Sequence, residues 1–152
     1  IENTSTLVRS YLVKSRVRIN LNLAAKKSKL NASPQQLGQV FMNLINNAVE
    51  AITGSSEFQK KLKEDPTYSG DIFIETFNQN NDLVIKVKDS GPGIAKKDLE
   101  HIFDPFFTRK KTMGMGVGLS ICHGIIEDHK GYIIAENDED GGAVFTITLP
   151  LK

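Results

Sequence analysis

The sequence predicts an α/β (α+β) fold, a two-layer α/β sandwich in which about three helices cover one face of a mixed sheet of about five strands. Strand-like segments come in pairs joined by short turns, and segments with helical periodicity lie between the pairs. Hydrophobic residues make up 39% of the 152 residues, which is enough for the core of one domain.

The first part of the chain supplies a strand and a long helix. Residues 4–15 have the pattern of a short amphipathic helix, and residues 17–24 alternate as a strand does. Ser33 is the expected N-cap of a helix whose first position is Pro34. This helix is expected to end near Gly54, because glycine commonly follows a helix.

The second part supplies two strand pairs. Residues 55–70 are polar, and they predict a surface loop with one candidate helical stretch at 57–64; contact with another domain is the alternative role. Strands are expected at 71–78, 83–89, 132–137 and 143–150, with helices at 96–102 and about 117–129. The turns at 79–82 and 138–142 join the members of each pair.

Charge and composition exclude several classes of function. The formal net charge is +1, so the sequence predicts neither a nucleic-acid partner nor contact of this domain with a membrane surface. No apolar run has the length of a bilayer-spanning helix. The single Cys122 excludes an internal disulfide and fits a reducing compartment.

The long helix carries an unusual polar face. Asn43, Asn46, Asn47 and Glu50 recur at spacings i, i+3, i+4 and i+7, which places them together. Asparagine is a poor helix former, so three of them in one helix lower its stability. A solvated face is the simpler interpretation. The alternative is a row of oxygen ligands for Mg²⁺, which keeps waters and shares phosphate oxygens with a nucleotide.

Two glycine-containing segments are candidates for ligand contacts. The turn "DSGPGI" at residues 89–94 has an acid directly before two glycines, which an ordinary turn does not need. The segment "GMGVGL" at residues 114–119 opens an apolar helix, whose N-terminus favours anions; a flexible hinge is the alternative. Between them, the basic run 109–111 follows "FDPFF". It is either a solvated run or part of a lid that brings a cation to a phosphate.

In this order, the segments resemble the ATP-binding catalytic domain of bacterial two-component sensor histidine kinases. That domain belongs to a superfamily that also contains gyrase, Hsp90 and MutL. "NLINNAVEA" resembles the N box, "DSGPGI" the G1 box, "FDPFF" the F box and "GMGVGL" the G2 box. The resemblance implies that residues 17–152 form this domain. Residues 1–16 would be a connector from an acceptor-histidine domain that precedes it. It also implies a cytoplasmic location, whether or not the parent kinase is anchored in a membrane.

The resemblance implies a site for ATP or ADP together with Mg²⁺. Asp89 would accept a hydrogen bond from the adenine amino group, and Asn47 would ligate the metal. Asn43 and Lys110 would act in catalysis, close to the phosphates. The full set of implied nucleotide-binding residues is Asn43, Asn47, Glu50, Asp89, Gly91, Gly93, Ile94, Phe103, Lys110, Thr112, Gly114, Met115, Gly116, Val117, Gly118 and Leu119.

One position separates a kinase from a hydrolase. The ATPases of this superfamily carry a glutamate four residues before the metal-binding asparagine, as a general base for water. Asn43 stands there and cannot take a proton at neutral pH. The resemblance therefore implies transfer of the γ-phosphate to a histidine on a separate helical-hairpin dimerisation domain of the same protein. A response regulator would be the downstream partner.

None of the histidines in the chain, at 101, 123 and 129, fits the acceptor pattern of these kinases, in which an acid directly follows the histidine. Two alternatives remain open at this point. One is a serine kinase or ATPase of the same superfamily, and the other is a non-catalytic module that senses nucleotides.

Overall fold

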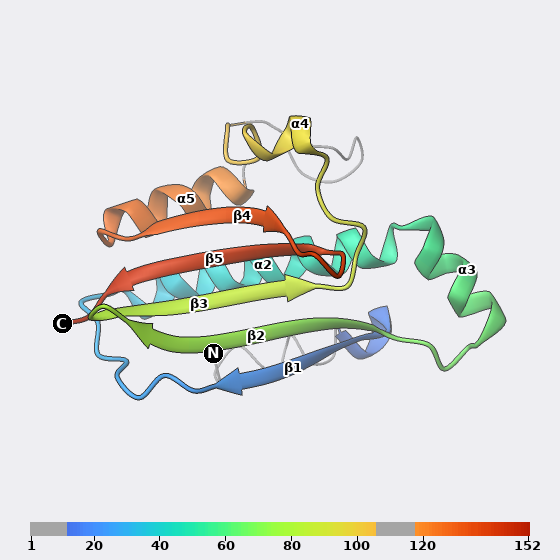
Figure 1. Cartoon of the computed structure of the whole chain (residues 1–152), viewed down its shortest axis with the longest axis horizontal. Helices are drawn as coiled ribbons and strands as arrows, with labels where there is room; N and C mark the ends of the chain where they lie inside the picture. The colour runs from blue at the N-terminus through green and yellow to red at the C-terminus, as the bar shows by residue number, and fades with distance from the viewer. Residues whose placement is uncertain (1–11, 106–117) are drawn as a thin grey trace.

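The computed structural model describes residues 12–105 and 118–152, which form a helical layer on a five-stranded sheet (Figure 1). The sheet has the order β1-β2-β3-β5-β4. Its strands are β1 (Val17–Leu23), β2 (Gly70–Gln79), β3 (Asp82–Asp89), β4 (Tyr132–Asn137) and β5 (Ala143–Pro150). β1 runs parallel to β2, and the other neighbours are antiparallel. The predicted mixed sheet is confirmed.

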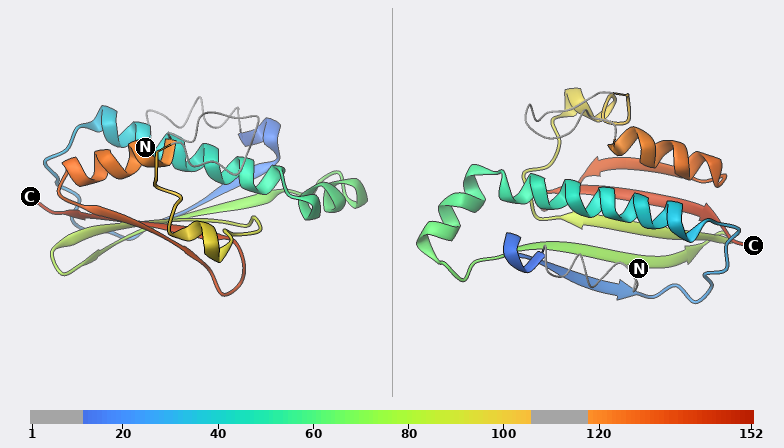
Figure 2. Two further views of the ribbon diagram at one scale, coloured as in Figure 1. Left: turned by 90° about the horizontal axis from the view of Figure 1, so that it is seen from above. Right: turned by 180° about the vertical axis from the view of Figure 1, so that it is seen from behind.

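The helices are α2 (Pro34–Thr53), α3 (Ser56–Glu64), α4 (Lys96–Leu99) and α5 (Gly118–Asp128). α2 packs on β2 and β3, and α5 packs on β4 and against α2. Figure 2 shows α2 and α5 together on one face of the sheet. The connection through α2 carries the chain from β1 to β2, and such a crossover is what a parallel strand pair requires.

Helix boundaries follow the capping residues. The Ser33 side chain accepts a hydrogen bond from the Gln36 N–H at 3.2 Å, and Gly54 ends α2 as predicted. α4 is shorter than the predicted helix at 96–102. Beyond Leu99 the backbone continues as turns, with i→i+3 bonds from His101 N to Asp98 O and from Asp104 N to His101 O.

The polar segment 55–70 contains the candidate helical stretch, as α3, which extends from the end of the sheet in Figure 1. Ser55 caps this helix by accepting from the Phe58 N–H at 3.1 Å. Phe58 is buried, and its ring centroid lies 5.6 Å from that of Tyr68. This contact fastens α3 to the chain that leads into β2.

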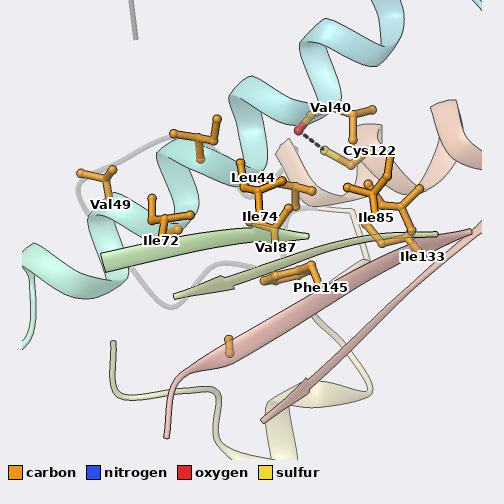
Figure 3. Packing of buried hydrophobic residues seen from close by; sticks show 14 of the residues in the cluster. Val40, Leu44, Val49, Ile72, Ile74, Ile85, Val87, Cys122, Ile133 and Phe145 are labelled. Atoms are coloured by element: carbon orange, nitrogen blue, oxygen red, sulfur yellow. Dashed lines mark hydrogen bonds between the residues drawn. The ribbon is translucent and has the colours of Figure 1, made fainter. Parts of the chain in front are cut away.

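The core lies between the helical layer and the sheet (Figure 3). Leu44 of α2, Ile126 of α5 and Ile147 of β5 are almost completely buried. Cys122 is also buried, and its Sγ lies 3.8 Å from the Val40 carbonyl oxygen of α2. Burial raises the pKa of this thiol to about 11, so Cys122 serves as a small core residue and not as a reactive group.

The three histidines have hydrogen-bonding or ionic partners in the fold. The backbone N–H of Ser33 donates to Nε2 of His129 at 3.0 Å, so Nδ1 carries the proton that is donated to the Ile125 carbonyl at 2.7 Å. Nδ1 of His101 lies 3.0 Å from an Asp104 carboxylate oxygen, and Nδ1 of His123 lies 3.1 Å from one of Glu127.

Among residues 12–105 and 118–152, none of the helices combines the length and the apolar character that crossing a membrane would require.

Candidate functional site

Asp89 occupies a position that strand periodicity reserves for the core. It ends β3 and pairs in register with Ile72 of β2, a residue with 0% exposure. Asp89 is itself only 2% exposed, and it is the one acidic or basic side chain in the buried class among the residues that the structure describes. A buried carboxylate is unfavourable unless it has partners. Its location therefore points to a functional role.

The fold uses one oxygen of Asp89, and the described residues donate no hydrogen bond to the other. Oδ1 accepts hydrogen bonds from the Gly91 N–H at 2.8 Å and the Ala143 N–H at 3.3 Å. Within the described part of the chain, no hydrogen bond reaches Oδ2. Burial raises the pKa of Asp89, and the two N–H groups counteract the rise only in part. The carboxylate thus presents one acceptor that a ligand can use.

The turn after Asp89 is held against β2 and α2. The Ser90 N–H donates to the Asp71 carbonyl at 3.0 Å, and the Asp71 N–H donates to Ser90 Oγ at 2.9 Å. A Cβ added to Gly91 would lie 3.3 Å from the Ala51 carbonyl carbon, so this glycine allows close approach to α2. The turn therefore lies beside the C-terminal part of that helix.

The far end of the turn is fixed by β4. Gly93 has a φ of +84°, which L side chains rarely adopt. The side chain of Asn137, the last residue of β4, then binds Ile94 twice. Oδ1 accepts from the Ile94 N–H at 2.7 Å, and Nδ2 donates to the Ile94 carbonyl at 2.6 Å.

The polar face of α2 connects this turn with the start of α5. Asn43, Asn46, Asn47 and Glu50 are all half-buried. Nδ2 of Asn43 donates to the Gly118 carbonyl at 3.4 Å, where α5 begins. From Asn43 to Ala51 the helix rises about 12 Å. Asn47 and Glu50 therefore lie between the Asp89 turn and the start of α5.

Phe103 packs against α5 and β5. Its ring centroid lies 5.4 Å from that of His123 in α5 and 6.3 Å from that of Phe145 in β5, in an edge-to-face arrangement. The preceding Ile102 is 3% exposed. The segment that leads toward residues 106–117 therefore begins from a fixed point.

The structure describes ten of the sixteen predicted nucleotide-binding residues. Asn43, Asn47 and Glu50 lie on α2, Asp89, Gly91, Gly93 and Ile94 on the turn, Phe103 beyond α4, and Gly118 and Leu119 at the start of α5. Lys110, Thr112, Gly114, Met115, Gly116 and Val117 lie outside the described residues, as do Phe106 and Phe107, the last two residues of the "FDPFF" segment. Asn137 and Ala143 also bind the turn, and no sequence signal identified them.

The oxygen donors on α2 suit a hard cation. In the described part of the chain, no three His, Cys, Asp or Glu side chains are grouped as a metal site. The Asn47 amide and the Glu50 carboxylate can supply oxygen ligands, and a cation with so few protein ligands would take its other oxygens from waters and from a phosphate. This donor set is compatible with Mg²⁺ bound together with a nucleotide.

Comparisons with known proteins agree with this geometry. A family model described as histidine kinase-, DNA gyrase B- and HSP90-like ATPase matches residues 32–152. The chain is 32% identical to sporulation kinase E of Bacillus subtilis over 154 residues, which is 100% of the chain and 19% of that protein. It is 38% identical to the sensor histidine kinase ZraS of Salmonella typhimurium over 135 residues, 88% of the chain and 26% of that protein. It thus spans a small part of both relatives.

Solved structures show the same likeness. The nucleotide-free catalytic domain of the histidine kinase ThkA is 33% identical, with a TM-score of 0.79, and the match covers 98% of this chain and 88% of that one. ThkA in complex with the response regulator protein TrrA matches with a TM-score of 0.75 and 30% identity, over 99% of this chain and 39% of that chain.

Proposed function

Because the chain belongs to the family of histidine kinase-, DNA gyrase B- and HSP90-like ATPases, we propose that it is the ATP-binding catalytic domain of a sensor histidine kinase. It would transfer the γ-phosphate of ATP to a histidine on a separate helical-hairpin dimerisation domain of the same protein. The observation that carries this proposal is the buried Asp89, whose Oδ2 is left for a ligand beside the polar face of α2.

Asp89 would select the base. Oδ2 can accept a hydrogen bond from the exocyclic amine of adenine. The backbone of Gly91 and Gly93 would lie against the ring. The phosphates would then extend along α2 toward the start of α5, past Asn47 and Glu50. Mg²⁺, held by Asn47 and phosphate oxygens, would neutralise part of the phosphate charge.

Asn43 favours transfer over hydrolysis. An amide cannot act as a general base, and its Nδ2 is already engaged by the Gly118 carbonyl at 3.4 Å. Phosphoryl transfer depends mainly on alignment and charge stabilisation, so it does not need a base at this position. We propose that Lys110 supplies positive charge to the terminal phosphates. An ATPase of the same superfamily is less favoured for the same reason.

We propose two protein partners. The first is the helical-hairpin domain that carries the acceptor histidine, because the histidines of this chain lack the acceptor pattern. The second is a response regulator, which is supported by the solved complex of ThkA with TrrA. Because ATP is the substrate, we place the reaction in the cytoplasm.

Phosphotransfer tests this function. The chain alone, incubated with γ-labelled ATP, should acquire no label. Addition of the separately expressed helical-hairpin domain of its parent kinase should give acid-labile label on that domain. The control is the same hairpin with its acceptor histidine replaced. Acid-labile label on His101, His123 or His129 of the chain alone would contradict the division between catalytic and acceptor domains.

Replacement of Asn47 by alanine should weaken ATP binding by about tenfold in Mg²⁺ and only slightly in EDTA, because the amide oxygen acts on the nucleotide through the metal. Calorimetric titration under both conditions measures the difference. Gln39→Ala is the matched control, since it removes an exposed amide from the same helix. Equal losses with and without Mg²⁺ would remove Asn47 from the metal site.

A further inference from the structure

We propose that Asn137 is a positioning residue for nucleotide binding, which holds the turn at residues 89–94 in the shape that receives adenine. The inference rests on the proposed function, since it concerns the same site. Asn137 is the last residue of β4, and it lies 43 residues after Ile94 in the sequence. None of the motifs includes it.

The Asn137 amide binds the turn as a neighbouring strand would. Its Oδ1 accepts from the Ile94 N–H and its Nδ2 donates to the Ile94 carbonyl, at 2.7 and 2.6 Å. Both groups of one peptide residue are therefore fixed by a single side chain. The fit is close, because a Cβ added to Gly93 would lie 2.8 Å from Oδ1.

The rest of the β4–β5 hairpin holds the opposite end of the turn. The Ala143 N–H donates to Oδ1 of Asp89 at 3.3 Å. Just before Asp89, the Lys88 Nζ lies 2.8 Å from Oδ2 of Asp138, and this contact lowers the pKa of Asp138. Asn137 and Ala143 thus bracket the turn from one hairpin. The hairpin therefore holds the Asp89 carboxylate and the Ile94 backbone at a fixed separation.

The contribution of Asn137 should appear in ligand affinity more than in stability. Its side chain is exposed, so water can replace its bonds to Ile94 in the unliganded protein. A turn that is no longer fixed must be ordered again when the nucleotide binds. Ordering the turn costs free energy, and this cost lowers the observed affinity for the nucleotide.

Asn78 provides a matched control. Its Oδ1 accepts from the N–H groups of Lys26 and Lys27, both at 2.9 Å, and its Nδ2 donates to the Lys27 carbonyl at 2.8 Å. It is the same kind of amide-to-backbone clamp. It lies on β2 six residues beyond Ile72, the register partner of Asp89, which is about 20 Å along the strand.

The experiment compares Asn137→Asp with Asn78→Asp. Asn137→Asp keeps the acceptor for the Ile94 N–H but places a carboxylate oxygen against the Ile94 carbonyl. We expect its ADP affinity, measured by calorimetry, to fall about tenfold, with a smaller ratio of ADP to GDP affinity. Hydrogen exchange of the Ile94 amide should become faster. Asn78→Asp should bind ADP within about twofold of the wild type, whatever stability it loses.

Each outcome decides a separate question. Wild-type ADP affinity with an unchanged ADP to GDP ratio in Asn137→Asp would overturn the role of Asn137. An equal loss in Asn78→Asp would do the same, because it would reduce the effect to general destabilisation. If Asn137→Asp does not fold, Asn137→Ala and Asn78→Ala make the same comparison without an added charge. Failure of the wild-type protein to bind ADP would instead refute the proposed function.

Discussion

Asp89→Asn should weaken ADP binding by about 10- to 150-fold, because a charge-assisted hydrogen bond in a buried site is lost. The asparagine carbonyl can take the place of Oδ1 and still accept from Gly91 and Ala143. Its amide group then stands where Oδ2 was, with a donor facing the donor amine of adenine. Calorimetric titration with ADP measures the loss.

The same substitution should leave the unliganded fold as stable as the wild type, or make it more stable. Burial raises the pKa of Asp89 above its ordinary value of 3.8. Folding therefore favours the protonated acid, and this stabilisation is complete below the ordinary pKa and is lost as the pH rises through the raised one. At neutral pH the ionised carboxylate is a cost to the fold, which asparagine removes.

Thermal unfolding at several pH values tests this separation of function from stability. The stability of Asp89→Asn relative to the wild type should increase from acidic to neutral pH, and Asp89→Ala should lose ADP affinity as well. Wild-type ADP affinity in either variant would remove Asp89 from the base site. A strongly destabilised Asp89→Asn would mean that the carboxylate serves the fold alone.

Gly142→Ala should cost about 2–6 kcal/mol of unfolding free energy, the sum of a strained φ and a steric conflict. Gly142 has a φ of +86°, and an added Cβ would collide with the Asp89 carbonyl oxygen. Relief of this conflict requires the hairpin to move away from Asp89, which removes the Ala143 N–H from Oδ1. ADP affinity should therefore fall together with stability.

Gly141 gives the control for Gly142. Its φ is +98°, but nothing lies within 4 Å of an added Cβ. Gly141→Ala should therefore cost only the backbone strain, about 1–3 kcal/mol, and should leave ADP binding close to that of the wild type. Urea unfolding and ADP titration of both variants make the comparison. Equal effects at the two glycines would show that the contact with Asp89 does not matter.

The elements that sequence reasoning predicts well are those with local causes. The bounds of α2 follow from Ser33, Pro34 and Gly54, which act on adjacent backbone groups. The strands follow from alternation over the residues that form them. α4 ends earlier than expected at Leu99, because the residues after it form i→i+3 turns instead of further helical turns.

The site was predictable only where its residues form motifs. Asp89 and the asparagines of α2 stand in recognisable segments, and the structure places them on neighbouring elements. Asn137 and Gly142 act through contacts with Ile94 and Asp89, which are far away in the sequence. Such contacts depend on how the β4–β5 hairpin meets the turn, and neither periodicity nor local propensity encodes that approach.

Titration of the wild-type chain with ADP and with GDP at neutral pH is the most direct test of the central claim, that the turn beginning at Asp89 is an adenine site. Guanine carries a carbonyl oxygen where adenine carries its amine, so it would set an acceptor against Asp89 Oδ2. We predict that ADP binds and that GDP binds at least about tenfold more weakly. Equal affinity for the two nucleotides, or no binding of either, would contradict the claim.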